Sequence, residues 1–251
     1  MPVQWIVLGT APAIPAPHEA NTFFACADGD HIVLVDCPGG ALRDLMRLGL
    51  PPQQITDLVL THFHPDHISG VPLLLMDLWL MGRTVPLRIH GLSPTLDRLE
   101  TLMDLFGWSS WPDFYPVAFH RLPAVERTPL LETPHTRWWA SPVCHLVPAI
   151  GLRMDLKGSG KSVVYSGDTE PCPTVERLAQ GATVLFHEAT GEVAGHTPPV
   201  EAAALALRAR VERLYLVHLP LERRERALEQ AQRLLGPRVA LAYQGLSLTF
   251  P

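Results

Sequence analysis

The chain has 251 residues, of which 47% are hydrophobic and 18% are charged, and its formal net charge is −5. This composition excludes an intrinsically disordered protein, and the length is sufficient for a sizeable core. The acidic balance argues against a dedicated polyanion-binding protein, which would usually carry a basic patch and a high pI.

Several short apolar runs rich in Val, Leu and Ile predict buried strands. In chain order these runs are Gln4-Leu8, His31-Asp36, Asp57-Thr61, Leu87-His90, Ser162-Ser166, Thr183-His187, Leu214-His218 and Val239-Tyr243. Helical patterns lie between them, over Gly40-Leu48, Val200-Arg213 and Leu221-Leu235. Strands and helices occur in both halves of the chain, which predicts an α/β layered fold in which helices cover sheets. One compact domain over residues 1–251 is the simplest account, because no repeat or low-complexity linker divides the chain.

A Trp-rich insert around residues 72–120 is less regular than the rest of the chain. Its aromatic side chains are Trp79, Phe106, Trp108, Trp111, Phe114 and Tyr115. We expect these side chains to pack onto the core under a loop-rich segment. The alternatives are an apolar wall beside the active site and a surface that makes a homodimer reasonable.

The ends of the chain and its cysteines indicate a cellular location. The four cysteines are Cys26, Cys37, Cys144 and Cys172, and none forms a C-x-x-C pair that would indicate a zinc ribbon or a thioredoxin-like motif. The N-terminus lacks the basic start and long apolar run of a signal peptide. The longest apolar stretch, Val71 to Met81, is too short to span a bilayer. We therefore expect a soluble cytoplasmic protein with reduced thiols and no membrane partner.

The segment His62-Phe63-His64-Pro65-Asp66-His67 directly follows the predicted strand Asp57-Thr61. A strand end followed by a tight loop can aim several side chains into one small volume. Imidazole nitrogens and carboxylates are ligands for zinc or manganese. The segment therefore predicts a metal site, although scattered surface histidines are the alternative. Two metal ions would need more ligands than these four residues supply.

Three further candidate ligands follow other strand-like runs, and they are His145, Asp168 and His218. Taken alone, each is more often a capping residue or a satisfied core residue than a ligand. Together with the first segment they make a plausible set of seven. Cys144, beside His145, is expected to be structural and not a ligand.

This order of residues, H-x-H-x-D-H followed by H, D and H, resembles the metallo-β-lactamase fold superfamily over nearly the whole chain. The resemblance implies a four-layer αββα sandwich with a binuclear site at one sheet edge. It implies that one metal ion is bound by His62, His64 and His145, that the second is bound by Asp66, His67 and His218, and that Asp168 bridges them. Asp36 matches the superfamily's first motif, with the implied role of orienting a ligand by hydrogen bonding.

The cofactor expected from these ligands is two zinc ions per chain, and manganese or iron would accept the same donors. Two metal ions close together lower the pKa of a shared water and so supply hydroxide, while one of them polarises the oxygen of the electrophile. Asp66 could also orient the nucleophile. The expected activity is therefore hydrolysis by a metal-bound hydroxide.

The segments Phe186-His187-Glu188-Ala189-Thr190 and Gly195-His196-Thr197 are similar to two motifs of the ribonuclease Z branch. The resemblance implies that Glu188 orients His196 and that His196 donates a proton to the leaving alcohol. A carboxylate partner raises an imidazole pKa, so the ring can be cationic near neutrality. The alternative is that His196 merely caps a helix that starts near Pro198.

Some features depart from ribonuclease Z, which usually carries an extended arm that grips tRNA. We would expect that arm between His145 and Asp168, but the interval is short and Gly158-Ser159-Gly160 predicts a hairpin turn. The loop after the first strand also lacks basic residues. We therefore expect hydrolysis of a small phosphodiester or ester, with RNA as a less favoured partner. The alternatives are a tRNA 3′-processing endoribonuclease with a reduced exosite, a lactone or thioester hydrolase, and a non-enzymatic metal-binding or redox module.

Overall fold

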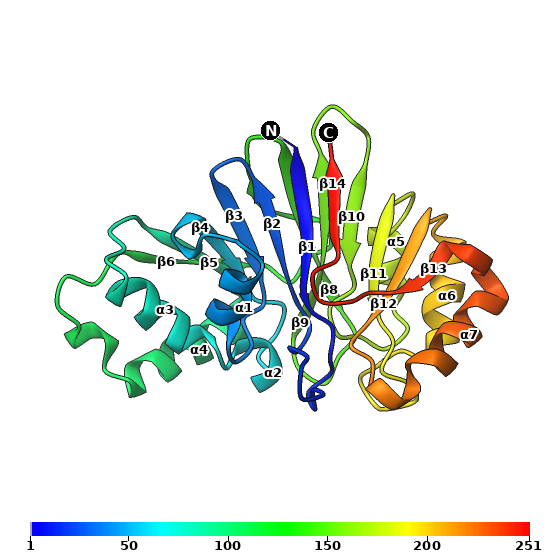
Figure 1. The fold of residues 1–251 in the computed structure, drawn as a ribbon, viewed down its shortest axis with the longest axis horizontal. Helices are drawn as coiled ribbons and strands as arrows, with labels where there is room; N and C mark the ends of the chain where they lie inside the picture. Colours follow the sequence, from blue (N-terminus) through cyan, green and yellow to red (C-terminus); the bar gives the residue numbers. More distant parts are fainter. Residues whose placement is uncertain (1) are drawn as a thin grey trace.

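Two seven-stranded sheets face each other in the computed structural model, which describes residues 2–251 (Figure 1). In spatial order, the first sheet contains β14 (Ser247–Phe250), β1 (Val3–Gly9), β2 (Phe23–Asp28), β3 (His31–Val35), β4 (Ile55–Val59), β5 (Leu87–Leu92) and β6 (Val117–Leu122). The second sheet contains β13 (Val239–Leu241), β12 (Arg213–Val217), β11 (Val184–Glu188), β10 (Ser162–Tyr165), β9 (Ala149–Leu156), β8 (Thr136–Val143) and β7 (Thr128–Glu132).

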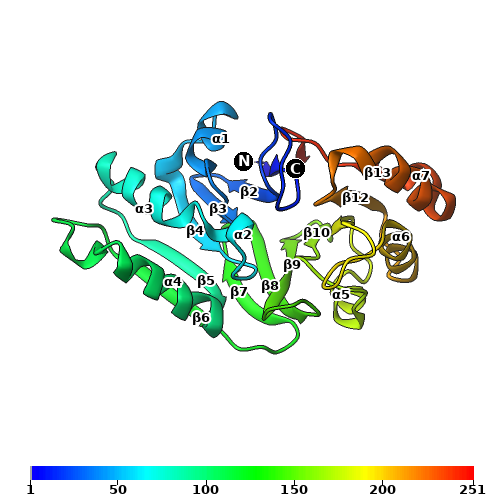
Figure 2. The same cartoon turned by 90° about the horizontal axis from the view of Figure 1, so that it is seen from below.

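Helices cover the outer face of each sheet (Figures 1 and 2). The first sheet carries α1 (Ala41–Arg47), α3 (Val71–Leu80) and α4 (Ser93–Leu105), and the second carries α5 (Pro173–Leu178), α6 (Pro199–Arg208) and α7 (Arg224–Leu235). Short 3-10 turns lie at η1 (Pro52–Gln54), η2 (Trp108–Ser110), η3 (Leu221–Arg223) and η4 (Gly236–Arg238). Across residues 2–251, every helix is too short or too polar to cross a membrane.

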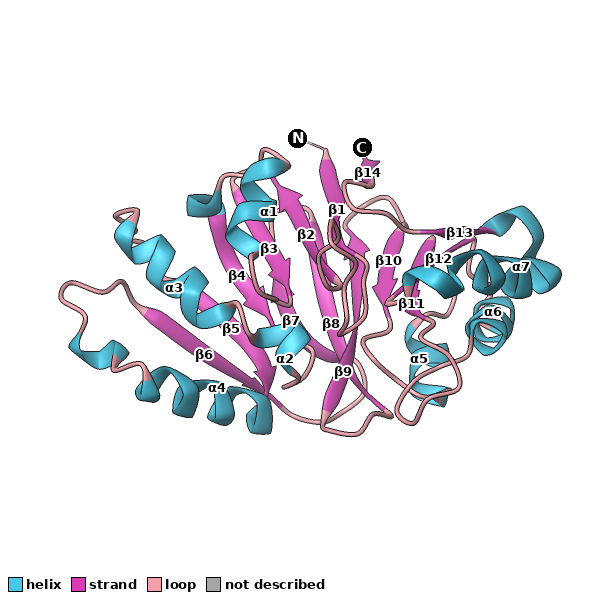
Figure 3. Cartoon of the chain, turned by 60° about the horizontal axis from the view of Figure 1, so that its bottom comes forward, coloured by secondary structure: helices cyan, strands magenta, loops and turns pink. Residues whose placement is uncertain are grey.

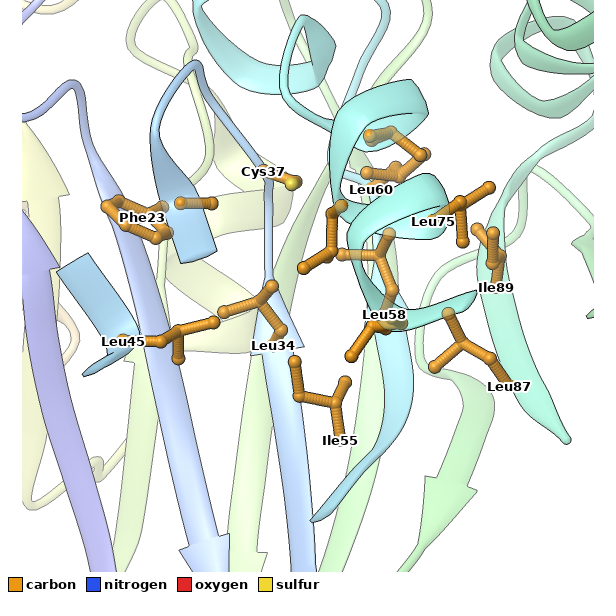
Figure 4. Close-up of a cluster of buried hydrophobic side chains, with 14 of the residues drawn as sticks. Phe23, Leu34, Cys37, Leu45, Ile55, Leu58, Leu60, Leu75, Leu87 and Ile89 are labelled. Atoms are coloured by element: carbon orange, nitrogen blue, oxygen red, sulfur yellow. The ribbon is translucent and has the colours of Figure 1, made fainter. Parts of the chain in front are cut away.

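Three apolar cores separate the four layers. On β3, Leu34 packs toward the helices, whereas Val33 and Val35 pack toward the opposite sheet, as the two-residue period of a strand requires. Figure 4 shows the first core, in which Leu34 of β3, Leu58 of β4 and Ile89 of β5 lie in a row across the sheet. The second core fills the space between the sheets, and the third lies under α5, α6 and α7. The predicted αββα sandwich is therefore confirmed.

All eight predicted strands are present, each with bounds within two residues of those expected. The helix predicted over Val200-Arg213 ends earlier, at Arg208, because Arg210 adopts a positive φ and the chain turns into β12. The Trp-rich insert is not loop-rich as expected, since it forms α3, β5, α4 and β6. Five of its six named aromatic side chains do pack onto the first core, with Trp79 stacked on Trp111 at a centroid distance of 5.3 Å, and the exception is the exposed Phe106. The expectation of core packing is thus confirmed.

One edge of both sheets collects the strand ends that matter for function. Strands β3 and β4 are parallel, as are β10, β11 and β12, so their carboxyl ends lie together at this edge, which we call the carboxyl edge. The start of β9 also lies there, because β9 is antiparallel to β10. The four-residue helix α2 (Pro65–Ile68) lies at the same edge (Figure 3). The Ile150 N–H of β9 donates to the Thr61 carbonyl after β4 (3.1 Å), which joins the sheets directly.

Candidate metal centre

The carboxyl edge brings all seven predicted ligands into one cluster. The ligand atoms form overlapping groups of three, and within each group they lie within 4.8 Å of one another. The groups are His62/His64/His145, His62/His67/Asp168, Asp66/His67/His218 and Asp168/His196/His218. The turn after β4, helix α2, the ends of β10 and β12 and the loop between β8 and β9 supply the seven predicted ligands. The parallel strand order therefore brings together residues that lie far apart in the sequence.

In the group His62/His64/His145, three ring nitrogens face one another. His64 Nδ1 lies 3.0 Å from His62 Nε2 and 3.1 Å from His145 Nε2. The outer nitrogen of His145, Nδ1, donates to the Gly195 carbonyl (2.7 Å). The Nδ1 of His62 lies 3.1 Å from the Thr61 hydroxyl, which itself donates to Asp36. This network places the ring protons of His62 and His145 on Nδ1, so their Nε2 lone pairs point inward.

In the group Asp66/His67/His218, the same arrangement recurs. His67 Nδ1 donates to Asp36 Oδ2 (2.8 Å), and His218 Nδ1 donates to the Thr190 hydroxyl (2.8 Å). The Thr190 hydroxyl in turn donates to the His218 carbonyl (2.9 Å), which leaves it free to accept from the ring. Both inner Nε2 atoms then lie 3.4 Å from Asp66 Oδ2.

Asp168 lies between the two groups. Its Oδ2 is 3.4 Å from Nε2 of both His67 and His218, and 3.9 Å from Nε2 of His62. The side chain is buried, and a buried carboxylate this close to three imidazoles is positioned to share its oxygens with both groups.

Two buried polar atoms of the cluster fit a metal ion. His67 Nε2 and Asp168 Oδ1 have no hydrogen-bond partner among residues 2–251. An unpaired buried polar atom is costly, so such atoms usually meet a ligand, an ion or water. Inward imidazole nitrogens and carboxylate oxygens are the donors that zinc, manganese and iron accept. The residues present therefore fit a divalent cation.

The electrostatics of the cluster also suit a cation. Burial alone would raise the pKa of the Asp168 carboxyl, but His218 and His67 hold that pKa well below its usual value. Burial would likewise raise the pKa of Asp66, and its hydrogen bonds to His218 and His67 lower it instead. Burial, reinforced by the neighbouring His67, lowers the pKa of His62 well below its usual value. Burial alone would lower the pKa of His67, but Asp168 and Asp36 raise it well above its usual value. A metal ion requires ionised carboxylates and neutral imidazoles, so it would displace the ring proton of His67.

Beside the cluster, Glu188 and His196 form the predicted pair. His196 Nδ1 lies 3.4 Å from Glu188 Oε1, and the His196 ring stacks on His218 with centroids 5.4 Å apart. Burial alone would lower the pKa of His196, but Glu188 raises it above its ordinary value. Glu188 also accepts the backbone N–H groups of Thr197 (2.6 Å) and Thr190 (2.9 Å), so it holds both ends of the loop between β11 and α6. The alternative role of His196 as a helix cap is wrong, because α6 begins at Pro199 with Pro198 as its N-cap residue.

Sequence reasoning missed the groups that orient the imidazoles, namely Thr61, Thr190 and the Gly195 carbonyl. Thr61 and Thr190 sit next to recognised residues, directly before His62 and at the end of the His-Glu-Ala-Thr motif. That adjacency was the only signal in the sequence. Gly195 acts through a backbone carbonyl, which any residue carries, so the sequence contained no signal for it.

Two residues of this edge have left-handed backbone conformations, Asp36 with φ 62° and His218 with φ 57°. Such conformations cost about 1–3 kcal/mol in non-glycine residues and gather at functional sites. They turn the chain sharply at the ends of β3 and β12, which directs both side chains into the cluster.

Comparisons with known proteins agree with this geometry. The family described as "Beta-lactamase superfamily domain" matches residues 31–219. The ribonuclease Z of Mycobacterium sp. strain KMS is 31% identical over 245 residues, covering 86% of this chain and 84% of the relative. The metallo-β-lactamase fold protein YhfI from Bacillus subtilis superposes with a TM-score of 0.82 at 22% identity, over 99% of this chain and 100% of YhfI. The short form of human tRNase Z superposes with a TM-score of 0.79 at 24% identity, over 99% of each chain. These two superpositions show a shared fold.

Proposed function

Because the chain belongs to the metallo-β-lactamase superfamily and is a metal-dependent hydrolase of its ribonuclease Z-like branch, we propose that it cleaves small phosphodiesters. The observation that carries this proposal is the Glu188–His196 pair beside the cluster of seven ligands. Cleavage of a phosphodiester expels an alkoxide, which needs a proton, and His196 is the protonatable group that faces the cluster without completing either histidine set.

The proposed ligand sets follow the two groups of the cluster. The first set is His62, His64 and His145, and the second is Asp66, His67 and His218. Asp168 is proposed to bridge them, since its Oδ2 approaches histidines of both sets. Zinc, two ions per chain, is the cofactor we propose, because it accepts donor sets rich in imidazole, and manganese or iron would accept the same donors.

We assign different roles in hydrolysis to different residues of the site. When bound, the metal ions lower the pKa of water at the site toward neutrality and polarise the phosphoryl oxygens. Asp66 accepts a hydrogen bond from the attacking water and so orients it. The Nδ1 of His196 faces Glu188, so its Nε2 is the atom that delivers a proton to the leaving oxygen. The raised pKa of His196 keeps the ring protonated at higher pH than an ordinary histidine.

A pair of substrates with different leaving groups tests the role of His196. The substitution His196→Ala should lower kcat about 10²–10⁴-fold for a diester with an alkyl leaving group, because general acid catalysis is worth that much. A p-nitrophenyl diester should lose far less, since p-nitrophenolate leaves without a proton. Metal content should be unchanged, and His120→Ala on the edge strand β6 is the matched histidine control. Equal losses for the two leaving groups, or no loss for either, would rule out His196 as the proton donor.

A second candidate is processing of tRNA 3′ ends, which the relative named ribonuclease Z favours. Against it, the chain between His145 and Asp168 contains only the β9–β10 hairpin, and the net charge is −5. A panel of a cyclic nucleotide, a p-nitrophenyl diester, a lactone and a precursor tRNA separates the candidates. We expect the highest kcat/KM for one of the small diesters. A higher kcat/KM for the precursor tRNA would favour the second candidate, and a higher value for the lactone would favour carbonyl chemistry.

A further inference from the structure

Two thiols meet directly beside the cluster. The Sγ atoms of Cys144 and Cys172 are 2.9 Å apart, and neither cysteine is in a disulfide. Cys144 is exposed and immediately precedes His145, whereas Cys172 is buried, four residues after Asp168. We propose that this pair is a redox-active dithiol, whose disulfide would tie the loop of His145 to the segment that follows Asp168.

The backbone around the two cysteines is already arranged for the bond. A disulfide has an S–S distance of about 2.05 Å, so the two sulfur atoms need to approach by less than about 1 Å. The Glu170 N–H donates to the Cys144 carbonyl (2.7 Å), and the Thr174 hydroxyl donates to the Pro142 carbonyl (2.7 Å). These hydrogen bonds hold the two segments together on both sides of the thiol pair. Closing the disulfide therefore needs side-chain movement and little backbone rearrangement.

The other two cysteines have different surroundings, which makes the pair distinctive. Cys26 lies inside the core between the sheets, with its Sγ 3.4 Å from the Met154 sulfur, and Cys37 lies in the first core. Both are completely buried, so an oxidant in solution does not reach them. Oxidation is thus directed to Cys144, the exposed member of the pair.

The environment of Cys172 suits a thiol that attacks a neighbouring sulfur. Burial alone would raise the pKa of Cys172, but hydrogen bonds from Cys144 and Thr174 and from the backbone at the start of α5 lower it below the ordinary value. A thiolate is the nucleophile in thiol–disulfide exchange. Because Cys144 is the exposed thiol, it is the entry point, and Cys172, whose Sγ lies 2.9 Å away, is the resolving residue.

With a small disulfide RSSR as oxidant, the exchange has two steps. In the first, Cys144 sulfur bonds to one sulfur of RSSR, the S–S bond breaks, and RS⁻ leaves and takes the Cys144 proton. In the second, Cys172 sulfur attacks Cys144 Sγ, the mixed disulfide breaks, and the second RS⁻ takes the Cys172 proton. Two protein thiols are oxidised to one disulfide, and RSSR is reduced to two RSH.

The cross-link would have a consequence for the proposed metal centre. His145 is held by the Gly195 carbonyl, and the Gly195 N–H donates to Glu170 (2.9 Å). A Cys144–Cys172 bond spans the two segments that carry His145 and Glu170, so it restrains this chain of contacts covalently. We expect the oxidised protein to release its metal ions more slowly, and this part rests on the proposed function.

Oxidised glutathione is the probe for the disulfide itself. Reduced protein should show four thiols on denaturation, and after incubation with oxidised glutathione it should show two, with a tryptic peptide linking Cys144 to Cys172. The Cys172→Ser variant should stop at a glutathione adduct on Cys144. The Cys26→Ala variant should close the disulfide as the wild type does. A persistent adduct in the wild type, or the absence of the linked peptide, would overturn the proposal, and both readouts are independent of any hydrolase activity.

Release of metal into a coloured chelator tests the consequence. The half-time should lengthen on the order of tenfold on oxidation of the wild type, a change of the size that contacts supporting metal ligands produce. It should not change in Cys172→Ser treated in the same way. A disulfide that forms without slowing release would show that the cross-link does not reach the metal centre.

Discussion

The orientation of most histidine rings in the cluster depends on the acceptor that contacts the outer ring nitrogen. His62, His67, His145 and His218 all present Nε2 inward, because Nδ1 is engaged by a hydroxyl, a carboxylate or a carbonyl. His64 is the exception and presents Nδ1. Residues that fix a ring in one tautomer should therefore matter almost as much as the ligands themselves.

Asp36→Asn is the test of that statement. The Asp36 carboxylate accepts from His67 Nδ1 and from the Thr61 N–H, each at 2.8 Å, and also from the Thr61 hydroxyl, so an amide in its place offers one acceptor oxygen for three donors. We expect the affinity for zinc to fall about 10–100-fold with the fold retained. Competition with a chelator of known affinity measures this. Asp155→Asn, far from the cluster on β9, is the control, and equal affinities in the two variants would contradict the expectation.

At the residue scale, the sequence predicted which side chains form the cluster but not which ring nitrogen each histidine presents to it. The order of His, Asp and His residues pointed to the set of seven, and the structure brings all seven together. The nitrogen that each ring presents depends on Thr61, Thr190 and a backbone carbonyl. Those contacts form only when the carboxyl edge is assembled, so no local pattern contains them.

At the scale of elements, the helix α2 is fixed to the turn that follows β3. The Cys37 N–H donates to the His67 carbonyl (2.7 Å), and the Gly70 N–H donates to the Cys37 carbonyl (2.9 Å). These bonds place the segment of His64, Asp66 and His67 against the left-handed turn at Asp36. The position of three predicted ligands thus depends on these two backbone hydrogen bonds.

Gly70→Ala should disturb that contact. A Cβ atom at Gly70 would lie 2.0 Å from the Pro38 carbonyl oxygen, so α2 or the turn must move. We expect a loss of about 1–3 kcal/mol in the free energy of unfolding, together with weaker zinc binding. Denaturant unfolding gives the first value. Gly39→Ala is the control, since its Cβ would meet nothing nearer than 3.8 Å, and a Gly70→Ala variant as stable as this control would refute the prediction.

A second prediction at this scale concerns pH and the pair of strands β4 and β5. Burial alone would raise the pKa of Asp57, but hydrogen bonds from His90 and Arg88 lower it well below its ordinary value. Since its pKa is lower in the folded state, the stabilisation from Asp57 is present at neutral pH. It is lost as the pH falls below about 4, the pKa of an unfolded Asp, toward the folded value. The free energy of unfolding should therefore fall more steeply between pH 5 and pH 2 in the wild type than in Asp57→Asn, and parallel curves would contradict this ionic role.

Three elements that the sequence did not predict were missed for identifiable physical reasons. The apolar stretch of α3 has no clear period, so it does not distinguish a buried helix from a strand. Strands β6 and β7 are edge strands, one in each sheet, and they expose much of their length. They therefore lack a continuous apolar run. Their place in the sheet comes from pairing with β5 and β8, which is information from distant parts of the chain.

At the scale of the whole molecule, the cluster lies where the two sheets meet. His62, His64, Asp66 and His67 follow a strand of the first sheet, whereas His145, Asp168 and His218 belong to the second. A metal ion bound by residues from both sheets would act as a clamp between the two halves of the fold. The resemblance to a known superfamily implied this arrangement, and composition and periodicity alone predicted only layered helices and sheets.

Removal of the metal should therefore lower the thermal stability of the whole chain. An ion present at 100 times its Kd stabilises the folded state by about 2.7 kcal/mol. For a protein of this size that corresponds to a fall in Tm of roughly 5–10 °C on chelation, reversed by adding zinc. Calorimetry measures the change, and His62→Ala, which loses a ligand of the first set only, should show a smaller fall in Tm on chelation. A Tm that chelation leaves unchanged in the wild type would contradict the proposed clamp.

Assembly of more than one chain stays a prediction. Leu105 and Phe106, at the end of α4, are exposed apolar side chains within the Trp-rich insert, which keeps a homodimer reasonable. The sequence could not decide this point, because residues that pack onto the core and residues that meet a partner have the same apolar character. Sedimentation at several protein concentrations would decide it.

The hydrogen bond from Ile150 to Thr61 has one more consequence. Ile150 is buried, and its amide spans the junction of the two sheets beside the cluster. Solvent deuterium can replace that amide proton only when the junction opens, so its exchange rate reports how often the halves of the molecule part. One backbone signal would then report the opening of the sandwich where the two sheets meet beside the proposed metal centre.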